Sequence, residues 1–91
     1  MNVESQMRAA LFVALEPTRL DLVNESHLHA GHASSPGTGE SHFRLMLVSP
    51  RFAGRSRLDR HRLVNEALGD LLRHRIHALA ITAYAPGETI R

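Results

Sequence analysis

The feature that most constrains the fold is the order of patterns between residues 40 and 84. Residues 40–48 alternate between two faces, and residues 76–84 form a second extended run with alternating and β-branched side chains. Between these runs, residues 59–73 repeat apolar side chains at the three and four spacing of an amphipathic helix. Two strands joined by a helix usually pair in parallel through a right-handed crossover. The sequence therefore predicts a strand, helix, strand unit with one parallel pair.

The N-terminal half adds a helix and a third strand. Residues 4–15 have helical spacing and are followed by Pro17, which prevents continuation, and residues 19–23 alternate as a strand. Residues 27–39 are rich in glycine and small polar side chains and are predicted to be a flexible loop. The strands on either side of this loop can form a hairpin. The prediction is an α+β fold of order α-β-β-α-β, with a three-stranded mixed sheet and its helices on one face.

The turn over residues 49–54 is predicted to place one aromatic side chain in the core. Phe52 lies in the middle of this turn, and Phe12 and Phe43 also fall in predicted elements as core residues. Tyr84 is the remaining aromatic residue of the chain. Few aromatic side chains are therefore left to stack on nucleic-acid bases.

Length and composition limit the classes of protein to consider. A chain of 91 residues supports one domain, predicted over 1–91 with a short C-terminal tail over 85–91. Since the sequence has no run of 18 apolar residues and no secretory signal, we expect a soluble, cytoplasmic protein that does not enter a membrane. It has no cysteine, so its own metal ligands would be imidazoles or carboxylates.

Histidine is the residue type that could carry chemistry. His77 opens the third predicted strand, where a side chain can project from the rim of the sheet, and the predicted loop contains His27, His29 and His32. Taken alone, the position of His77 is explained more simply by a hydrogen bond to a carbonyl at the helix end than by metal ligation. Neither a nucleophile elbow nor a phosphate-binding glycine loop is present, so the sequence does not favour an enzyme.

Three further histidines have structural explanations from the sequence. His42 lies on a strand, and His61 extends the apolar stripe of the second helix, where a buried hydrogen bond is expected. His74 follows the last turn of that helix, where a cation interacts favourably with the helix dipole. We therefore place none of them among the predicted metal ligands.

All eleven basic residues are arginine, although the formal net charge is only +2. Five of them gather around the turn and the start of the second helix, and they form a local basic patch. These residues are Arg51, Arg55, Arg57, Arg60 and Arg62. The patch could contact nucleic acid or an acidic face of a protein partner.

Five short motifs occur in a fixed order along most of the chain. They are Asn24-Glu25-Ser26, Ser41-His42-Phe43, the turn from Val48 to Gly54, Arg60-His61-Arg62 and His77-Ala78-Leu79. With these motifs the chain resembles the BolA family, small proteins with a variant of the KH fold. The resemblance runs from about residue 10 to Pro86. It departs from the family after Pro86, where the usual tryptophan is absent, so the short terminal helix typical of the family is not predicted with the other elements.

The resemblance implies a role in metal chemistry. In BolA proteins the position of His77 ligates a [2Fe–2S] cluster that is held jointly with a monothiol glutaredoxin, whose cysteine and a glutathione supply thiolates. The second BolA ligand is a cysteine or histidine from the loop between the first two strands. Because this chain lacks cysteine, that ligand would be a histidine, with His29 the first choice and His32 the alternative. The implied function is non-enzymatic iron–sulfur trafficking or iron sensing in a glutaredoxin heterodimer.

The resemblance also carries a second expectation. Some BolA proteins are described as transcriptional regulators, so the resemblance allows weak DNA binding through Arg51, Arg55, Arg57, Arg60 and Arg62. A homodimer of the free protein is a separate expectation. KH-like folds clamp single-stranded nucleic acid with a Gly-x-x-Gly loop. Here the segment Gly54-Arg55-Ser56-Arg57 has an arginine in place of the second glycine.

Overall fold

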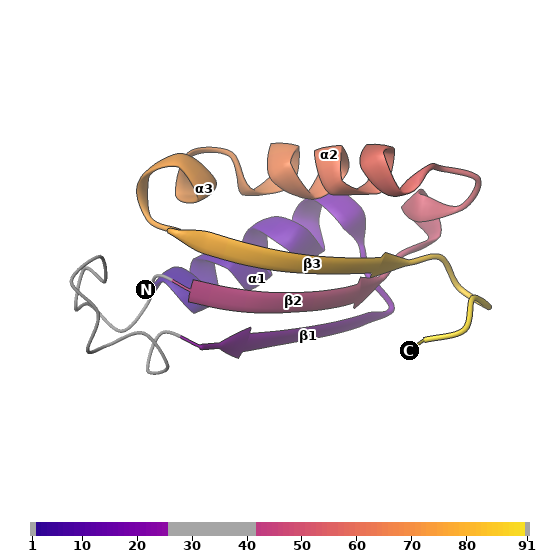
Figure 1. Ribbon diagram of the computed structural model, residues 1–91, viewed down its shortest axis with the longest axis horizontal. Helices are drawn as coiled ribbons and strands as arrows, with labels where there is room; N and C mark the ends of the chain where they lie inside the picture. The colour runs from indigo at the N-terminus through magenta and orange to yellow at the C-terminus, as the bar shows by residue number, and fades with distance from the viewer. Residues whose placement is uncertain (1, 26–41, 91) are drawn as a thin grey trace.

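The computed structural model describes residues 2–25 and 42–90, which form a sheet covered by helices (Figure 1). The elements in chain order are α1 (Val3–Leu15), β1 (Arg19–Asn24), β2 (His42–Val48), the 3-10 turn η2 (Pro50–Phe52), α2 (Arg57–Leu68), α3 (Asp70–His74) and β3 (Ala78–Tyr84). This order confirms the predicted α+β fold. No helix in the described ranges is long and apolar enough to cross a membrane.

The sheet has the order β1-β2-β3 and is mixed, as predicted. β1 runs antiparallel to β2, with Arg19 opposite Val48. β2 runs parallel to β3, in a register that begins with His42 opposite Ala78 and continues without interruption to Val48 opposite Tyr84. The C-terminal ends of β2 and β3 therefore meet at one end of the sheet, and His42 and the start of β3 meet at the other.

Helix α1 forms where the sequence predicts it, with one more residue at its start. The Asn2 side chain accepts a hydrogen bond from the Ser5 backbone N–H at 2.8 Å and so caps the helix. The buried side chains recur at helical spacing: Val3, Met7, Leu11 and Leu15. The Ser49 hydroxyl, itself buried, donates to the Leu15 carbonyl at 2.5 Å, which ties the end of α1 to the end of β2.

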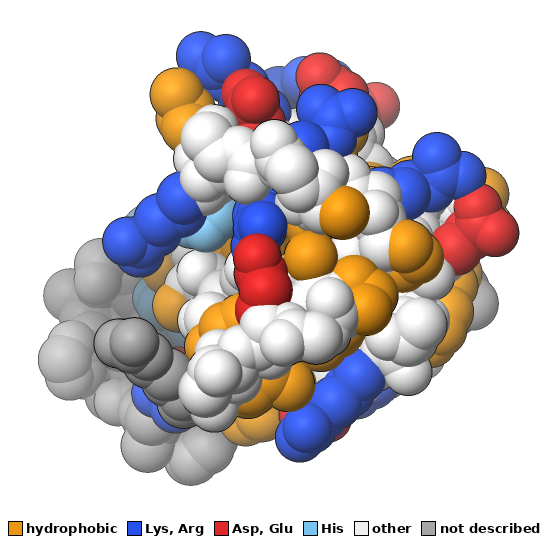
Figure 2. All heavy atoms as spheres, turned by 90° about the vertical axis from the view of Figure 1, so that its right-hand side faces the viewer, with side chains coloured by type: hydrophobic (Ala, Val, Ile, Leu, Met, Phe, Trp, Pro, Cys, Tyr) orange, Lys and Arg blue, Asp and Glu red, His pale blue; other side chains and the backbone are white. Residues whose placement is uncertain are grey.

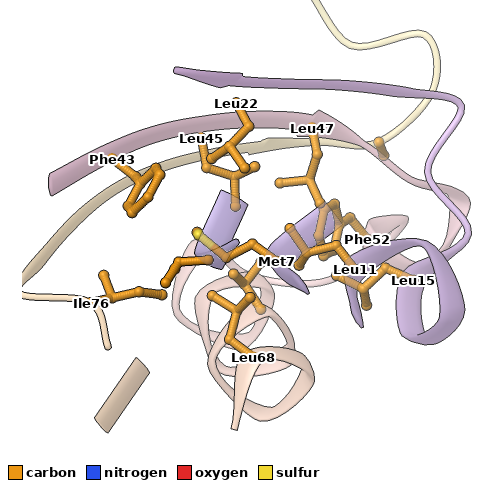
Figure 3. Packing of buried hydrophobic residues seen from close by; sticks show 13 residues of the cluster. Met7, Leu11, Leu15, Leu22, Phe43, Leu45, Leu47, Phe52, Leu68 and Ile76 are labelled. Carbon is orange, nitrogen blue, oxygen red and sulfur yellow. The ribbon is translucent and has the colours of Figure 1, made fainter. Parts of the chain in front are cut away.

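The core lies between the sheet and helices α1 and α2 (Figure 3). Phe43, Leu45 and Leu47 of β2 point into it, and Phe52 fills it from η2 with no exposed surface, as predicted. The prediction that Phe12 belongs to the core is wrong, because half of its surface is exposed. Phe12 lies one position beyond Leu11, which α1 directs inward, so the helix turns Phe12 away from the core.

The second helix is not continuous from 59 to 73, so that prediction is wrong. α2 ends at Leu68, and α3 begins at Asp70 after Gly69, whose φ of 51° and ψ of −123° are accessible to glycine but strained for other residues. The third strand begins at Ala78 and not at residue 76, and Ile76 enters the core just before it. Residues 85–90 form no helix.

Candidate functional site

Two histidine rings meet at the end of the sheet where β2 and β3 begin. His42 is the first residue of β2 and is 9% exposed, whereas His77 lies immediately before β3 and is exposed. Their ring centroids are 4.9 Å apart and their planes are tilted by 50°. The position of His77 at the rim of the sheet agrees with the sequence analysis, and the contact with His42 is additional.

The parallel register explains this contact. Because His42 is opposite Ala78, the residue before Ala78 lies beside the first residue of β2. Ile76 is buried in the core, which fixes the backbone just before His77. The imidazole of His77 is therefore held at the surface by a buried neighbour on one side and a strand on the other.

The segment that contains the predicted loop histidines is joined to this same end of the sheet. The Glu25 backbone N–H donates to the His42 carbonyl at 2.8 Å, and the Glu25 carboxylate pairs with Arg44 at 2.9 Å. The two residues that flank residues 26–41, Glu25 and His42, are thus adjacent at this end of the sheet, and His42 is the one in contact with His77. His27, His29 and His32 themselves lie outside the described residues.

Within residues 2–25 and 42–90, no three histidine, cysteine, aspartate or glutamate side chains are grouped closely enough to hold a metal ion. The pair of His42 and His77 supplies at most two imidazole ligands, and the chain has no thiolate to add. Four-coordinate iron at this site would need ligands from residues 26–41, from a partner, or from both. Within the described ranges, this end of the sheet therefore offers two imidazoles in contact and no thiolate.

The sequence analysis missed the proximity of His42 to His77, although a signal was present. Both residues occur at the start of predicted strands that pair in parallel, and parallel strands joined by a helix begin at the same end of the sheet. His42 was given only a structural role, although this pairing places it at the same end of the sheet as His77. His42 takes part in further interactions in the structure, so its environment is not limited to His77.

The other two histidines lie apart from this pair. His61 is partly exposed and lines a cavity beside α2, so the expected burial of its side chain is wrong. His74 is the last residue of α3 and is exposed, as its proposed interaction with the helix end requires. Neither contributes to the site around His77.

The predicted arginine patch lies at the opposite end of the sheet from His77. This end includes η2, the start of α2 and the C-terminal end of β3. Figure 2 views the molecule from this end and shows basic and acidic side chains around an area of hydrophobic side chains. A cavity of about 420 Å³ opens there, and Arg55, Arg57, Arg60 and His61 are among its lining residues. The structure thus brings part of the predicted patch together.

Acidic side chains neutralise much of this patch. Arg51 pairs with Glu16 at 2.5 Å, Arg60 with Glu88 at 2.6 Å, and Arg62 approaches Asp59 at 3.8 Å. In contrast, Arg55 and Arg57 have no acidic partner among the residues that the structure describes. Two of the five predicted arginines are therefore available for an external anion.

The pair of Arg60 and Glu88 ties the C-terminal tail to the sheet. Arg60 donates to both oxygens of the Glu88 carboxylate, at 2.6 and 2.9 Å, and also to the Ala83 carbonyl at 3.1 Å. The Ala85 backbone N–H donates to Glu88 at 2.7 Å. The hydrogen bond from Arg60, followed by that from Ala85, lowers the pKa of Glu88 from its ordinary 4.5 to about 2.

This lowered pKa predicts a contribution to acid stability. Because the folded state holds the Glu88 carboxylate ionised, its stabilising effect is complete above pH 4.5 and is lost as the pH falls to about 2. We expect Glu88→Gln to destabilise the fold at neutral pH and to make its stability depend less on pH in this interval. Urea titrations from pH 6 to pH 2 measure both effects, with the exposed Glu66→Gln as a control. Parallel pH profiles for wild type and Glu88→Gln would contradict the assignment.

Comparisons with known proteins agree with one another. A protein-family model described as "BolA-like protein" matches residues 11–88. The chain is 51% identical over 86 residues to "BolA-like protein 1" of Mus musculus, which covers 94% of this chain and 60% of the mouse protein. It is 47% identical over 73 residues to "DNA-binding transcriptional regulator BolA" of Vibrio cholerae, covering 80% of this chain and 65% of that protein.

The solved structures give the same result for the fold. The structure of "BolA1 from Arabidopsis thaliana" superposes with a TM-score of 0.86 at 39% identity, and the match covers 99% of this chain and 98% of the other. The chain spans less than two thirds of the mouse and Vibrio cholerae proteins, so parts of those relatives have no counterpart in it.

Proposed function

The chain belongs to the BolA family, and on this basis we propose that it is a non-enzymatic module that binds a [2Fe–2S] cluster jointly with a monothiol glutaredoxin. Its role would be iron–sulfur trafficking or iron sensing. The observation that carries the proposal is the exposed His77 at the rim of the sheet, in contact with His42, the first described residue after the segment that contains His29 and His32.

Chain length supports a ligand from that segment. An extended chain spans at most about 3.5 Å per residue, so His29, four residues after Glu25, stays within about 14 Å of it. His32 is limited to about 25 Å by the same rule. Since Glu25 is hydrogen-bonded to His42, whose ring contacts His77, the chain length from Glu25 allows either histidine to reach His77. His29 remains the first choice because its spacing from the Asn24-Glu25-Ser26 motif resembles that of the loop histidine in histidine-type BolA relatives.

The chemistry of the available donors fits a divided site. Two neutral imidazoles from this chain would bind one iron, and thiolates from the glutaredoxin cysteine and from glutathione would complete the centre. Replacing thiolates by imidazoles raises the reduction potential of such a cluster. In this chain, His77 would hold the ligating nitrogen at the surface, and His42 would restrict the orientation of its ring.

The proposal is tested by mixing the protein with a monothiol glutaredoxin, glutathione and the cluster. Absorbance and circular dichroism should then show a species distinct from the cluster held by glutaredoxin alone. Size-exclusion chromatography should place both proteins in one complex that contains iron. Spectra equal to those of glutaredoxin alone would rule out joint binding.

DNA binding is the second candidate function. It is favoured by the similarity to the Vibrio cholerae regulator and by the two arginines without acidic partners at the cavity, Arg55 and Arg57. Neutralisation of the rest of the patch argues for weak binding. The same surface could instead receive an acidic segment of a protein partner.

A salt titration provides a quantitative test of DNA binding. If Arg55 and Arg57 each neutralise one phosphate of a DNA duplex, the affinity should fall about tenfold between 50 and 200 mM salt. Replacing both arginines with glutamine should remove this dependence. The matched control replaces Arg73 and Arg75, two exposed arginines at and after the end of α3, and should leave it unchanged. Fluorescence anisotropy with a labelled duplex measures the DNA affinity of each double variant as a function of salt. Equal salt dependence for the two double variants would show that Arg55 and Arg57 do not form the DNA-binding surface.

A further inference from the structure

The outer edge of β3 lacks the usual protection of an edge strand. β3 is the last strand in the order β1-β2-β3, so no described strand pairs with its outer side (Figure 1). Its seven residues, Ala78–Tyr84, include no charged residue or proline, and its register with β2 contains no bulge. Natural proteins usually protect such edges with charges, prolines or bulges. The other edge strand, β1, carries the exposed ion pair of Arg19 and Asp21.

Backbone hydrogen bonds show which groups of β3 face outward. The Tyr84 carbonyl accepts from the Ser49 N–H at 3.0 Å and so points towards β2, whereas the Ala83 carbonyl accepts from Arg60 and points away. Because backbone direction alternates along a strand, the N–H and C=O groups of Leu79 and Ile81 also point away from β2. Arg60 already binds the Ala83 carbonyl, which leaves Leu79 and Ile81 at the centre of the open edge.

The two ends of this edge differ in chemistry. At its start is His77, where a partner that shares a metal centre with this chain must make contact. Near its end is the cavity whose lining includes Ile81 and Ala83 together with Arg55 and Arg57, the arginines without acidic partners. A segment lying along the edge would thus extend from the metal site to two unneutralised guanidinium groups.

We propose that an extended segment of the thiolate-bearing partner adds to β3 as a fourth strand and places a carboxylate near Arg55 and Arg57. This inference rests on the proposed function, which supplies the partner. Strand addition uses main-chain hydrogen bonds for affinity and side-chain pockets for specificity. A second copy of this chain fits less well, because its β3 carries no carboxylate and the Asp21 carboxylate of its other edge strand, β1, is already paired with Arg19.

Amide hydrogen exchange tests the strand addition without a mutation. Adding a cluster-free monothiol glutaredoxin should slow exchange at Leu79, Ile81 and Ala83, whose N–H groups face outward. Exchange at Met7 and Leu11, buried inside α1, should stay the same. Unchanged exchange at all three β3 positions in a formed complex would overturn the proposal. So would slowing that appears without glutaredoxin as protein concentration rises, because the occupant would then be a second copy.

A pair of variants isolates the backbone group. Ile81→Pro removes the outward N–H, whereas Ile81→Ala removes similar side-chain packing and keeps that N–H. Calorimetry with cluster-free glutaredoxin should show about tenfold weaker binding for Ile81→Pro than for Ile81→Ala, which corresponds to the loss of one hydrogen bond. If both variants fold and bind cluster-free glutaredoxin with equal affinity, the proposal is overturned. If Ile81→Pro does not fold, the amide exchange of the wild-type protein decides whether a strand is added to β3.

Strand addition to β3 and joint ligation of the cluster are measured by separate experiments. Docking is measured without the cluster, and joint ligation is measured by the cluster spectrum. Protected β3 amides with no shared-cluster spectrum would support strand addition and reject joint ligation. A shared-cluster spectrum with unprotected β3 amides would reject strand addition alone.

Discussion

Replacing His77 with alanine is expected to remove the spectral signature of imidazole ligation from the complex with glutaredoxin. His77 is exposed at the rim of the sheet and contacts His42, the first described residue after the segment that contains His29 and His32. Loss of residues that merely support a metal ligand typically lowers metal affinity about 10- to 100-fold, so loss of the ligand itself should cost at least about 100-fold. Visible circular dichroism and electron paramagnetic resonance of the reconstituted complex measure this change.

His74→Ala is the matched control. His74 is also exposed and lies three residues earlier, at the end of α3, but it is not part of the histidine pair. We expect the cluster spectrum of this variant to equal that of the wild type. If His77→Ala also keeps the full spectrum while its melting curve shows a folded protein, His77 is not a ligand.

A third variant tests whether His42 binds iron or only contacts His77. His42→Phe keeps an aromatic ring beside His77 but removes both nitrogens. Because the predicted second ligand is His29 or His32, the imidazole signature should survive. Its loss in a folded variant would make His42 a ligand and would reduce the need for a histidine from residues 26–41.

Phe52→Ala is expected to have the largest effect on stability. The Phe52 side chain is fully buried where η2 meets α1 and the sheet, so truncation removes its packing and leaves a cavity (Figure 3). Such substitutions cost about 3–5 kcal/mol, a large part of the roughly 5–15 kcal/mol that stabilises a typical domain. For a chain of this size the melting temperature should fall by about 10–40 °C. Urea denaturation and thermal melting by far-ultraviolet circular dichroism measure the loss.

Phe12→Ala removes the same side chain from an exposed position. Half of the Phe12 surface is already in contact with solvent, so we expect a loss of less than about 1 kcal/mol. Comparable destabilisation by the two substitutions would contradict the assignment of Phe52 to the core and of Phe12 to the surface.

Local patterns in the sequence were sufficient for most of the fold. Alternation over residues 40–48 separated two faces of β2, and the structure buries Phe43, Leu45 and Leu47 on one of them. Helical spacing predicted the buried stripe of α1. Hairpin pairing of β1 with β2 and parallel pairing of β2 with β3 followed from the connections between them. These features depend on residues close in sequence, or on general rules of chain connection.

Contacts between distant residues could not be predicted in the same way. Arg60 and Glu88 are 28 positions apart, and only the folded tail brings their side chains together. This contact changed the interpretation of the arginine patch, because a cation counted as available from sequence is paired in the fold. In contrast, the parallel pairing of the predicted strands placed His42 and His77 at the same end of the sheet, and only the ring contact itself depends on the exact register.

The error in the second helix had a local cause. Leu71 and Leu72 continue the apolar spacing of α2, so the pattern alone did not reveal that the helix ends. Gly69 was the available signal, since glycine with a positive φ is a common way to end a helix. Apolar periodicity persisted across the break because α3 still covers the same core.

Gly69 also bears on how tolerant the histidine site is to sequence change. A methyl group at this position would meet its nearest neighbour, the Glu66 carbonyl, only at 3.8 Å, so space is not what excludes other residues. The restriction comes from the backbone angles, which set the path of the chain through α3 to Ile76 and His77. Replacing Gly69 would therefore be expected to shift the backbone that leads to His77 while leaving every proposed ligand in the sequence.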